Sequence, residues 1–245
     1  MPKRFVVPAS DFPESSRFTG DFELAEALVA AARQLHETAT PHSTLDTAVR
    51  LAVGLVPGAE QAGISVLDRG GNRRAVAWTD ESVRAVEAGV PGRVKPSYGE
   101  HLWQEPVVRV ADSETEEGGE PLAVLGLRSA LALRLRADKR RLTVLTVYAG
   151  KPGVFDEAAT RIGRLFTAHV SLALESVTVR EQLTEAMRTR DLIGQATGIL
   201  MERMNIDAAE SFDSLVRASQ RENVKLRDLA RRIVDANNAT REAGS

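Results

Sequence analysis

The stretch from residue 191 to residue 203 decides the fold of the C-terminal part of the chain. It reads Asp-Leu-Ile-Gly-Gln-Ala-Thr-Gly-Ile-Leu-Met-Glu-Arg, a helical pattern with Gly194 and Gly198 four positions apart. Each glycine inside a helix costs roughly 1 kcal/mol relative to alanine. The two glycines share one face of the helix and leave it without side chains. This bare face predicts close approach of another backbone, which is either a packed helix or a nucleic-acid loop.

Two more helices are expected after this stretch. Asp207 and Glu210 form a capping-box pattern at the start of the first one, and Asn205 and Asn223 suit the left-handed ends of helices. The expected core positions of these two helices are Ala208 or Ala209, Phe212, Leu215, Val216 and Ser219, then Leu226, Leu229, Ala230, Ile233 and Val234. Three short helices with tight turns predict a compact all-α bundle over residues 191–238, followed by a flexible tail over residues 239–245.

A long helix is expected before the bundle, because residues 156–190 contain no proline and a single glycine. Its imperfect coiled-coil seam, with spacings of three and four, consists of Ile162, Leu165, His169, Leu172, Ser176, Val179, Leu183 and Ala186. The helix far exceeds the average of about 11–12 residues. It either packs on a sheet throughout, or packs first and then pairs with its twin in a homodimer. We favour the second arrangement, with residues 176–190 as the coiled-coil linker.

The part from residue 21 to residue 175 is expected to be an α+β domain with an antiparallel sheet. Asp21 can cap a first helix, and a second helix begins near Ser43 and ends before Pro57. Apolar or alternating runs predict strands over residues 63–67, 74–78, 107–110, 130–136 and 141–148. The acidic residues 112–120 are expected to form a solvated loop, and residues 1–20 a flexible arm.

Composition excludes several classes of function. The 245 residues include no cysteine, so disulfides, thiolate metal sites and cysteine nucleophiles are excluded. The four histidines are scattered, and no Ser–His–Asp, P-loop or metal-ligand spacing is present, so we expect neither an enzyme nor a cofactor or metal site. No apolar run reaches the ~18–20 residues of a membrane span, and the first residues lack a signal-peptide core. We therefore expect a cytoplasmic protein with no membrane partner.

The C-terminal bundle closely resembles the ANTAR domain, a three-helix RNA-binding module of bacterial antiterminators. The matching residues are Ile193 to Ala196, Gly198 to Arg203, Ala209, Phe212, Leu215, Ser219 and Lys225 to Ala230. The resemblance covers nearly all of the roughly fifty residues of the module. One departure is Thr197, where a lysine is common, so one phosphate contact is missing from the implied surface.

The preceding domain resembles a GAF domain over about residues 21–175, by its order of elements and by Tyr148-Ala-Gly150 followed by Phe155-Asp156. The resemblance implies a sensor of a small-molecule or protein signal. Relatives that join the two domains often carry a Gly-Glu-Gly-Pro-Cys-like segment before the third strand. Here residues 89–99 read Gly-Val-Pro-Gly-Arg-Val-Lys-Pro-Ser-Tyr-Gly, without a cysteine.

The resemblance implies a regulator that binds RNA stem-loops in nascent transcripts and prevents a terminator from folding. Unpaired loop bases can be read on their edges while lysine and arginine contact phosphates. The candidate base-reading residues are Gly194, Gln195, Ala196, Thr197 and Gly198, and the candidate backbone contacts are Arg203, Gln220, Arg221, Lys225 and Arg227. Two alternatives remain: a sensor that acts only through protein–protein contacts, and DNA binding through a helix-turn-helix. The last helix has few Asn or Gln residues to read base edges, which disfavours DNA.

Overall fold

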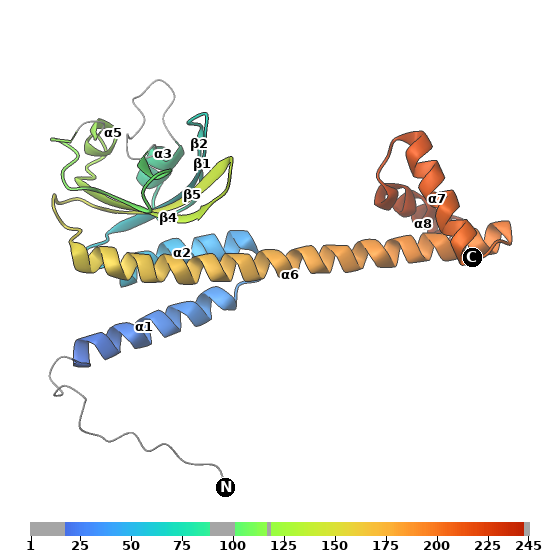
Figure 1. Cartoon of the computed structure of the whole chain (residues 1–245), viewed down its shortest axis with the longest axis horizontal. Helices are drawn as coiled ribbons and strands as arrows, with labels where there is room; N and C mark the ends of the chain where they lie inside the picture. The colour runs from blue at the N-terminus through green and yellow to red at the C-terminus, as the bar shows by residue number, and fades with distance from the viewer. Residues whose placement is uncertain (1–17, 89–100, 117–118, 243–245) are drawn as a thin grey trace, which may run out of the picture. The chain divides into compact units, whose positions relative to one another are not determined.

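The computed structural model describes residues 18–88, 101–116 and 119–242. Internal contacts divide the chain into two compact units, with the boundary between Val177 and Thr178. The first unit holds the sheet, and the second is entirely helical (Figure 1). A single helix, α6, supplies residues to both units, because it runs without interruption from Glu157 to Met204.

The first unit is built on one five-stranded antiparallel sheet. Its strands are β1 (Gln61–Asp68), β2 (Arg73–Trp78), β3 (Val107–Val110), β4 (Ser129–Ala137) and β5 (Arg141–Ala149), in the order β2-β1-β5-β4-β3. These strands confirm the five predicted from the apolar and alternating runs. The sequence did not specify their order, in which β5 pairs with both β1 and β4 at the centre.

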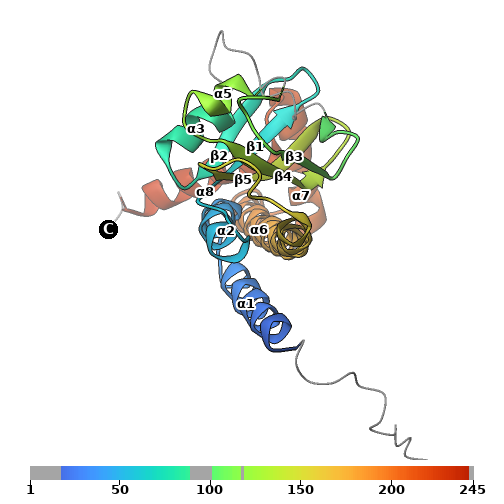
Figure 2. The same cartoon turned by 90° about the vertical axis from the view of Figure 1, so that its left-hand side faces the viewer.

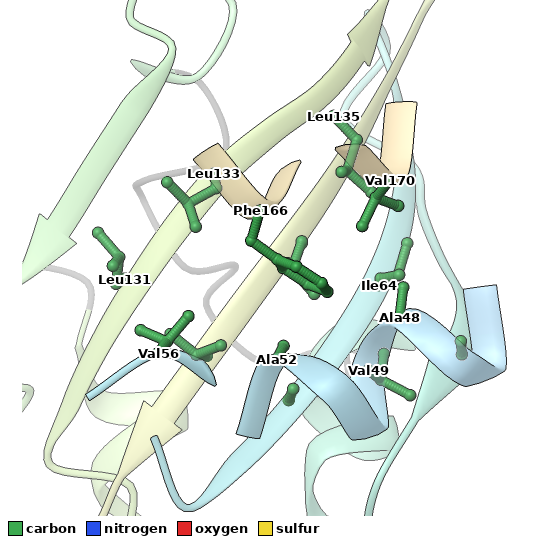
Figure 3. Packing of buried hydrophobic residues seen from close by; sticks show 14 of the residues in the cluster. Ala48, Val49, Ala52, Val56, Ile64, Leu131, Leu133, Leu135, Phe166 and Val170 are labelled. Carbon is green, nitrogen blue, oxygen red and sulfur yellow. The ribbon is translucent and has the colours of Figure 1, made fainter. Parts of the chain in front are cut away.

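Helices cover both faces of this sheet (Figure 2). The helices of the first unit are α1 (Phe18–His36), α2 (Pro41–Leu55), α3 (Glu81–Ala88), α5 (Glu120–Ala123) and the N-terminal part of α6. Figure 3 shows one core, where Phe166 and Val170 of α6 lie over the sheet next to Ala52 of α2. The other face carries a second core, in which α3 contributes Val83 and Val86.

Helix α6 approaches the sheet closely at Gly163. A Cβ atom at this position would lie 2.7 Å from Cδ1 of the buried Leu133 on β4. A side chain at this position would have to displace the buried Leu133, so the glycine permits the close contact between helix and strand. The residues of α6 that face the sheet follow a spacing of four and three, and they include Ala159, Gly163, Phe166, Val170 and Ala173.

A buried polar cluster holds α3 to the sheet. Glu87 has no exposed surface, and its carboxylate accepts a hydrogen bond from the Tyr148 hydroxyl at 2.7 Å and forms an ion pair with Arg73. The Arg73 Nε atom also donates to the Ser65 hydroxyl at 2.9 Å. Because these groups are removed from water, each depends on the others for its hydrogen bonds.

Three expectations for the first unit need correction. Helix α1 begins at Phe18, so Asp21 lies within its first turn and does not precede it, and α2 begins at Pro41 behind the N-cap Thr40. Helix α3 was missed because it is only 8 residues long and shows no extended apolar stripe. In the acidic loop, Asp112 accepts two hydrogen bonds from Arg128, at 3.0 and 2.8 Å, which lower the pKa of its carboxyl group below the usual value.

The second unit is the expected three-helix bundle, formed by the C-terminal part of α6 with α7 (Ala208–Glu222) and α8 (Leu226–Glu242). Its buried core consists of Ala196, Leu215, Leu229, Ala230 and Val234. The first bundle helix is not short, because α6 continues through residue 190 without a break. Helix α8 also runs beyond the predicted end at residue 238.

The N-cap and the two left-handed residues predicted for this unit are confirmed, but only one of the two hydrogen bonds of a capping box forms at the start of α7. Asp207 is the N-cap of α7 and accepts a hydrogen bond from the Glu210 backbone, while Asn205 and Asn223 have φ values of 50° and 53°. The core prediction for α7 is partly wrong, because Phe212 is 43% exposed and Ser211 is fully buried in its place. The Ser211 hydroxyl donates to the Thr197 carbonyl of α6 at 2.9 Å, which satisfies a polar group inside the bundle.

We expect Glu87→Ala to destabilise the first unit by about 3–5 kcal/mol, because it leaves the Arg73 guanidinium buried without its partner. The exposed Glu81, whose carboxylate lies 2.6 Å from Arg84, is the matched control, and Glu81→Ala should cost less than about 1 kcal/mol. Denaturant unfolding followed by tryptophan fluorescence measures this, since both tryptophans, Trp78 and Trp103, belong to the first unit. Equal costs for the two variants would contradict the role of the buried cluster.

Candidate nucleic-acid interface

The bare face predicted from Gly194 and Gly198 is present and exposed on α6. Among the described residues, no atom outside the local helix backbone lies within 4 Å of a Cβ atom built at either glycine. Both lie two positions from Ala196, which is about 200° around a helix. Ala196 is fully buried in the bundle core, so the glycine face points away from α7 and α8. Helix packing within the described chain therefore does not account for these glycines.

The other three candidate base-reading residues occupy different environments. Gln195 is exposed beside the glycine face, where its amide can donate and accept hydrogen bonds. Thr197 is half-buried, and its hydroxyl donates to the Ile193 carbonyl at 2.8 Å. Ala196 has no exposed surface, so its methyl group packs in the bundle and cannot touch a ligand in this conformation. Sequence spacing alone did not distinguish these three neighbours.

Two of the candidate phosphate contacts are engaged within the unit. Arg203 donates to the Asn237 side chain at 2.8 Å and thereby links α6 to α8. Arg227 lies 3.6 Å from the Glu185 carboxylate and 3.6 Å from that of Asp228. Both arginines would have to exchange these partners for a phosphate.

The remaining candidates lie around the turn between α7 and α8. Gln220, Arg221 and Lys225 are exposed, and within the described part of the chain their side chains have no hydrogen-bond or ion-pair partner. The turn is well defined, because Asn223 adopts the left-handed conformation and the Ser219 hydroxyl donates to the Val224 carbonyl at 2.7 Å. Of the four basic residues predicted as phosphate contacts, Arg221 and Lys225 thus have no partner among the described residues, and they lie around the α7–α8 turn, away from the glycine face.

An apolar groove lies beside the bundle core, where α7 meets α6. It has a volume of about 690 Å³ and is lined by Glu181, Gln182, Glu185, Ala186, Thr189, Arg190, Ile193 and Phe212. The exposed ring of Phe212 forms one wall. The sequence did not indicate this groove, because Phe212 has the spacing of a core residue.

Comparison with known families identifies both units. The model of the GAF domain matches residues 38–175, more than half of the chain, and the model of the ANTAR domain matches residues 181–234. The chain therefore belongs to the family of regulators in which a GAF domain is followed by an ANTAR domain. Both resemblances noted in the sequence are confirmed, and the protein combines a sensor domain with an RNA-binding domain. A search of curated protein sequences gave no significant match.

Solved structures confirm the GAF fold. A bacteriophytochrome from R. palustris has a TM-score of 0.58 and 12% identity, over 77% of this chain and 44% of its own. The photosensory core module of the Stigmatella aurantiaca phytochrome has a TM-score of 0.58 and 13% identity, over 84% of this chain and 46% of its own. The chain thus spans less than half the length of these phytochromes. The GAF domain of a Coxiella burnetii phosphoenolpyruvate-protein phosphotransferase has a TM-score of 0.53 and 13% identity, over 67% of this chain and 99% of its own.

Within residues 18–88, 101–116 and 119–242, no group of three or more His, Cys, Asp or Glu side chains is placed to hold a metal ion. None of the helices in these ranges is long and apolar enough to span a bilayer. The segment 89–99, where the sequence departs from its relatives, lies outside them.

We expect Gly198→Ala to stabilise the helical unit by up to about 1 kcal/mol, because the added methyl group meets open space and alanine favours a helix. Gly163→Ala is the matched control and should destabilise the first unit. The cost of overpacking against Leu133, about 1–3 kcal/mol, exceeds the gain in helix propensity. Thermal unfolding followed by circular dichroism, together with amide exchange in α7 and α8, measures both effects. A destabilised Gly198→Ala bundle would show that this face is packed.

Proposed function

We propose that the chain is a dimeric, signal-responsive regulator that recognises RNA stem-loops in nascent transcripts and promotes transcription antitermination. The observation that carries this proposal is the exposed face of Gly194 and Gly198, which has no packing role among the described residues, in a chain with an ANTAR domain. The helix retains two glycines there despite their cost of roughly 1 kcal/mol each. A ligand that needs a helix face without side chains explains why both glycines are present.

The side chains around the glycine face can form hydrogen bonds with a base. Asp191 and Glu202, which lie three positions before Gly194 and four after Gly198, share that side of α6 with Arg190, which lies four positions before Gly194, and all three are exposed. The two carboxylates can accept hydrogen bonds from base amino groups, and the Arg190 guanidinium can donate to base or phosphate oxygens. An unpaired loop base can therefore stack on the bare backbone with Gln195 beside it. Phosphate contacts then fall to Arg221 and Lys225.

A second copy of the chain is proposed to pair along α6. Leu172 and Leu183 of the predicted seam are 59% and 61% exposed, whereas Phe166 and Val170 on the neighbouring face are buried. Residues 181–188 of α6 are all exposed. A partner along this stretch would stabilise it, because a helix exposed on all sides gains little from packing. The seam therefore remains available after α6 has packed on the sheet.

Charge favours a parallel pair in register. In such a coiled coil, a residue just before one core position faces the residue five positions later on the partner helix. Glu175 and Arg180 have this spacing, and both are exposed. Within one helix they lie on different faces, so their complementarity has an effect only between two copies.

The GAF domain is proposed to act as a sensor and not as a catalyst, in a cytoplasmic protein. An alternative function is a sensor that acts through protein contacts without RNA. The groove at Phe212 is the observation that favours this alternative, because an exposed aromatic wall suits an apolar partner surface. RNA binding by the full chain distinguishes the two functions.

We expect Gly198→Ala to weaken binding of the full chain to a stem-loop RNA at least tenfold (about 1.4 kcal/mol), because the methyl group occupies the site of the base. Lys225→Ala should weaken binding to every RNA. It should also reduce the slope of the logarithm of affinity against the logarithm of salt concentration by about 1, because one phosphate contact is lost. The stem-loop is one that the full chain selects from a library with a randomised loop, and titration at several salt concentrations gives both quantities. Normal affinity of a folded Gly198→Ala chain would contradict the proposed site.

The dimer is tested with charge exchange at residues 175 and 180. Glu175→Arg or Arg180→Glu alone should raise the dimer dissociation constant several-fold, as expected for two exposed ion pairs of about 0.2–1 kcal/mol each. The double exchange should restore dimerisation. Light scattering across a dilution series measures this against twice the chain mass of 26.5 kDa. A wild-type chain that stays monomeric at micromolar concentration, or a double variant no better than the singles, would contradict the parallel seam.

A further inference from the structure

Two turns of the GAF sheet lie side by side at one end of the sheet, outside the proposed RNA site. The β1–β2 turn follows Asp68, and the β4–β5 turn precedes Arg141, which is the strand partner of Asp68 (Figure 1). Arg69 of the first turn donates from Nε to the Lys139 carbonyl of the second turn at 2.8 Å. The two turns therefore present one continuous surface.

This surface is strongly basic. The hairpin-end patch consists of five exposed side chains on β2, β4, β5 and the β4–β5 turn, namely Arg74, Arg136, Lys139, Arg140 and Arg141. In the ranges that the structure describes, none of the five has an ion-pair or hydrogen-bond partner for its side chain. The patch thus holds five exposed positive charges in a chain whose net charge is −2. Bulk composition gave no indication of it.

The carboxylates of Asp68 and Asp138 already accept hydrogen bonds within these turns. Asp138 accepts from the amides of Arg140 and Arg141 at 2.7 and 2.8 Å. These hydrogen bonds, and then the charges of Arg141 and Arg136, lower the pKa of the Asp138 carboxyl group. Asp68 accepts from the backbone and the side-chain amide of Asn72, both at 2.9 Å. Both carboxylates shape their turns through these hydrogen bonds.

We infer that the hairpin-end patch is a second RNA contact, which binds the phosphate backbone of the transcript outside the stem-loop. Free arginines suit phosphate oxygens, because the planar guanidinium donates two parallel hydrogen bonds. A membrane surface fits less well. Peripheral membrane sites combine basic residues with exposed apolar ones, and the large exposed apolar side chains of the described chain lie outside the two turns.

The inference extends the proposed function from one contact to two. The ANTAR domain reads the loop, and the patch supplies affinity without sequence preference. Phosphate contacts dominate the salt dependence of binding, and each contributes a slope of about 0.7 on single-stranded RNA. Two contacts on one transcript also raise the effective concentration of the loop at its site.

The test uses the full chain and the triple variant Arg136→Ala/Lys139→Ala/Arg140→Ala. The probes are the selected stem-loop with and without a single-stranded extension, and an oligouridylate longer than about 16 nucleotides, which has no stem. The control variant Arg33→Ala/Arg50→Ala/Arg164→Ala removes the same charge from exposed positions on α1, α2 and α6. Denaturant unfolding followed by tryptophan fluorescence verifies that both variants fold as the wild type does.

We expect the triple variant to bind oligouridylate at least about tenfold more weakly than the control variant does, with a salt slope lower by about 2. It should also lose the extra affinity that the extension gives the stem-loop, while its affinity for the bare stem-loop stays within about twofold. Equal binding of oligouridylate by the triple and control variants overturns the inference. So does a loss confined to binding of phosphatidylserine vesicles, which assigns the patch to a membrane surface. If the wild type binds no stem-loop, the proposed function is overturned. The oligouridylate comparison then still tests whether the patch binds RNA.

Discussion

The structure depends on the way one helix divides its faces. Helix α6 has 48 residues and supplies both units, so its sequence must satisfy different neighbours at different points along its length. Phe166 and Val170 pack on the GAF sheet, Leu172 and Leu183 stay exposed on the seam, and Ala196 enters the bundle core. Each set repeats every three to four residues, as a helix requires. Each unit therefore depends on a different stretch of the same helix.

In the proposed RNA complex, the residues that contact the base are separate from the residues that contact phosphates. The bundle core takes one side of α6 at Ala196 and leaves the opposite side, at Gly194 and Gly198, bare. Exposed carboxylates and the exposed Arg190 lie beside that face, and further basic groups occur at Arg221 and Lys225 and on the GAF sheet. The proposed complex assigns the base contact to the glycine face and the phosphate contacts to these other elements. That arrangement lets affinity and specificity be changed independently.

Much of the fold follows from local patterns. The five strands, the cap at Asp207 and the left-handed Asn223 could be predicted because alternation, capping and turn chemistry act over a few residues. The pairing of β5 with β1 and β4 could not, because it depends on contacts distant in the sequence. Phe212 has core spacing but is exposed, because Ser211 takes the buried position and bonds to Thr197. The candidate RNA-binding residues were predicted as one surface. In the structure Ala196 is buried, and the side chains of Arg203 and Arg227 contact other residues of the same unit.

The central claim is that an RNA loop base contacts the exposed glycine face of α6. A stem-loop with thiouridine in its loop, bound by the full-length chain and irradiated, tests this claim most directly, because cross-links form only at residues in contact with the base. The account predicts cross-linked peptides that contain residues 191–202, and few from α7 or α8. Cross-links confined to the α7–α8 turn, with none on α6, would contradict it.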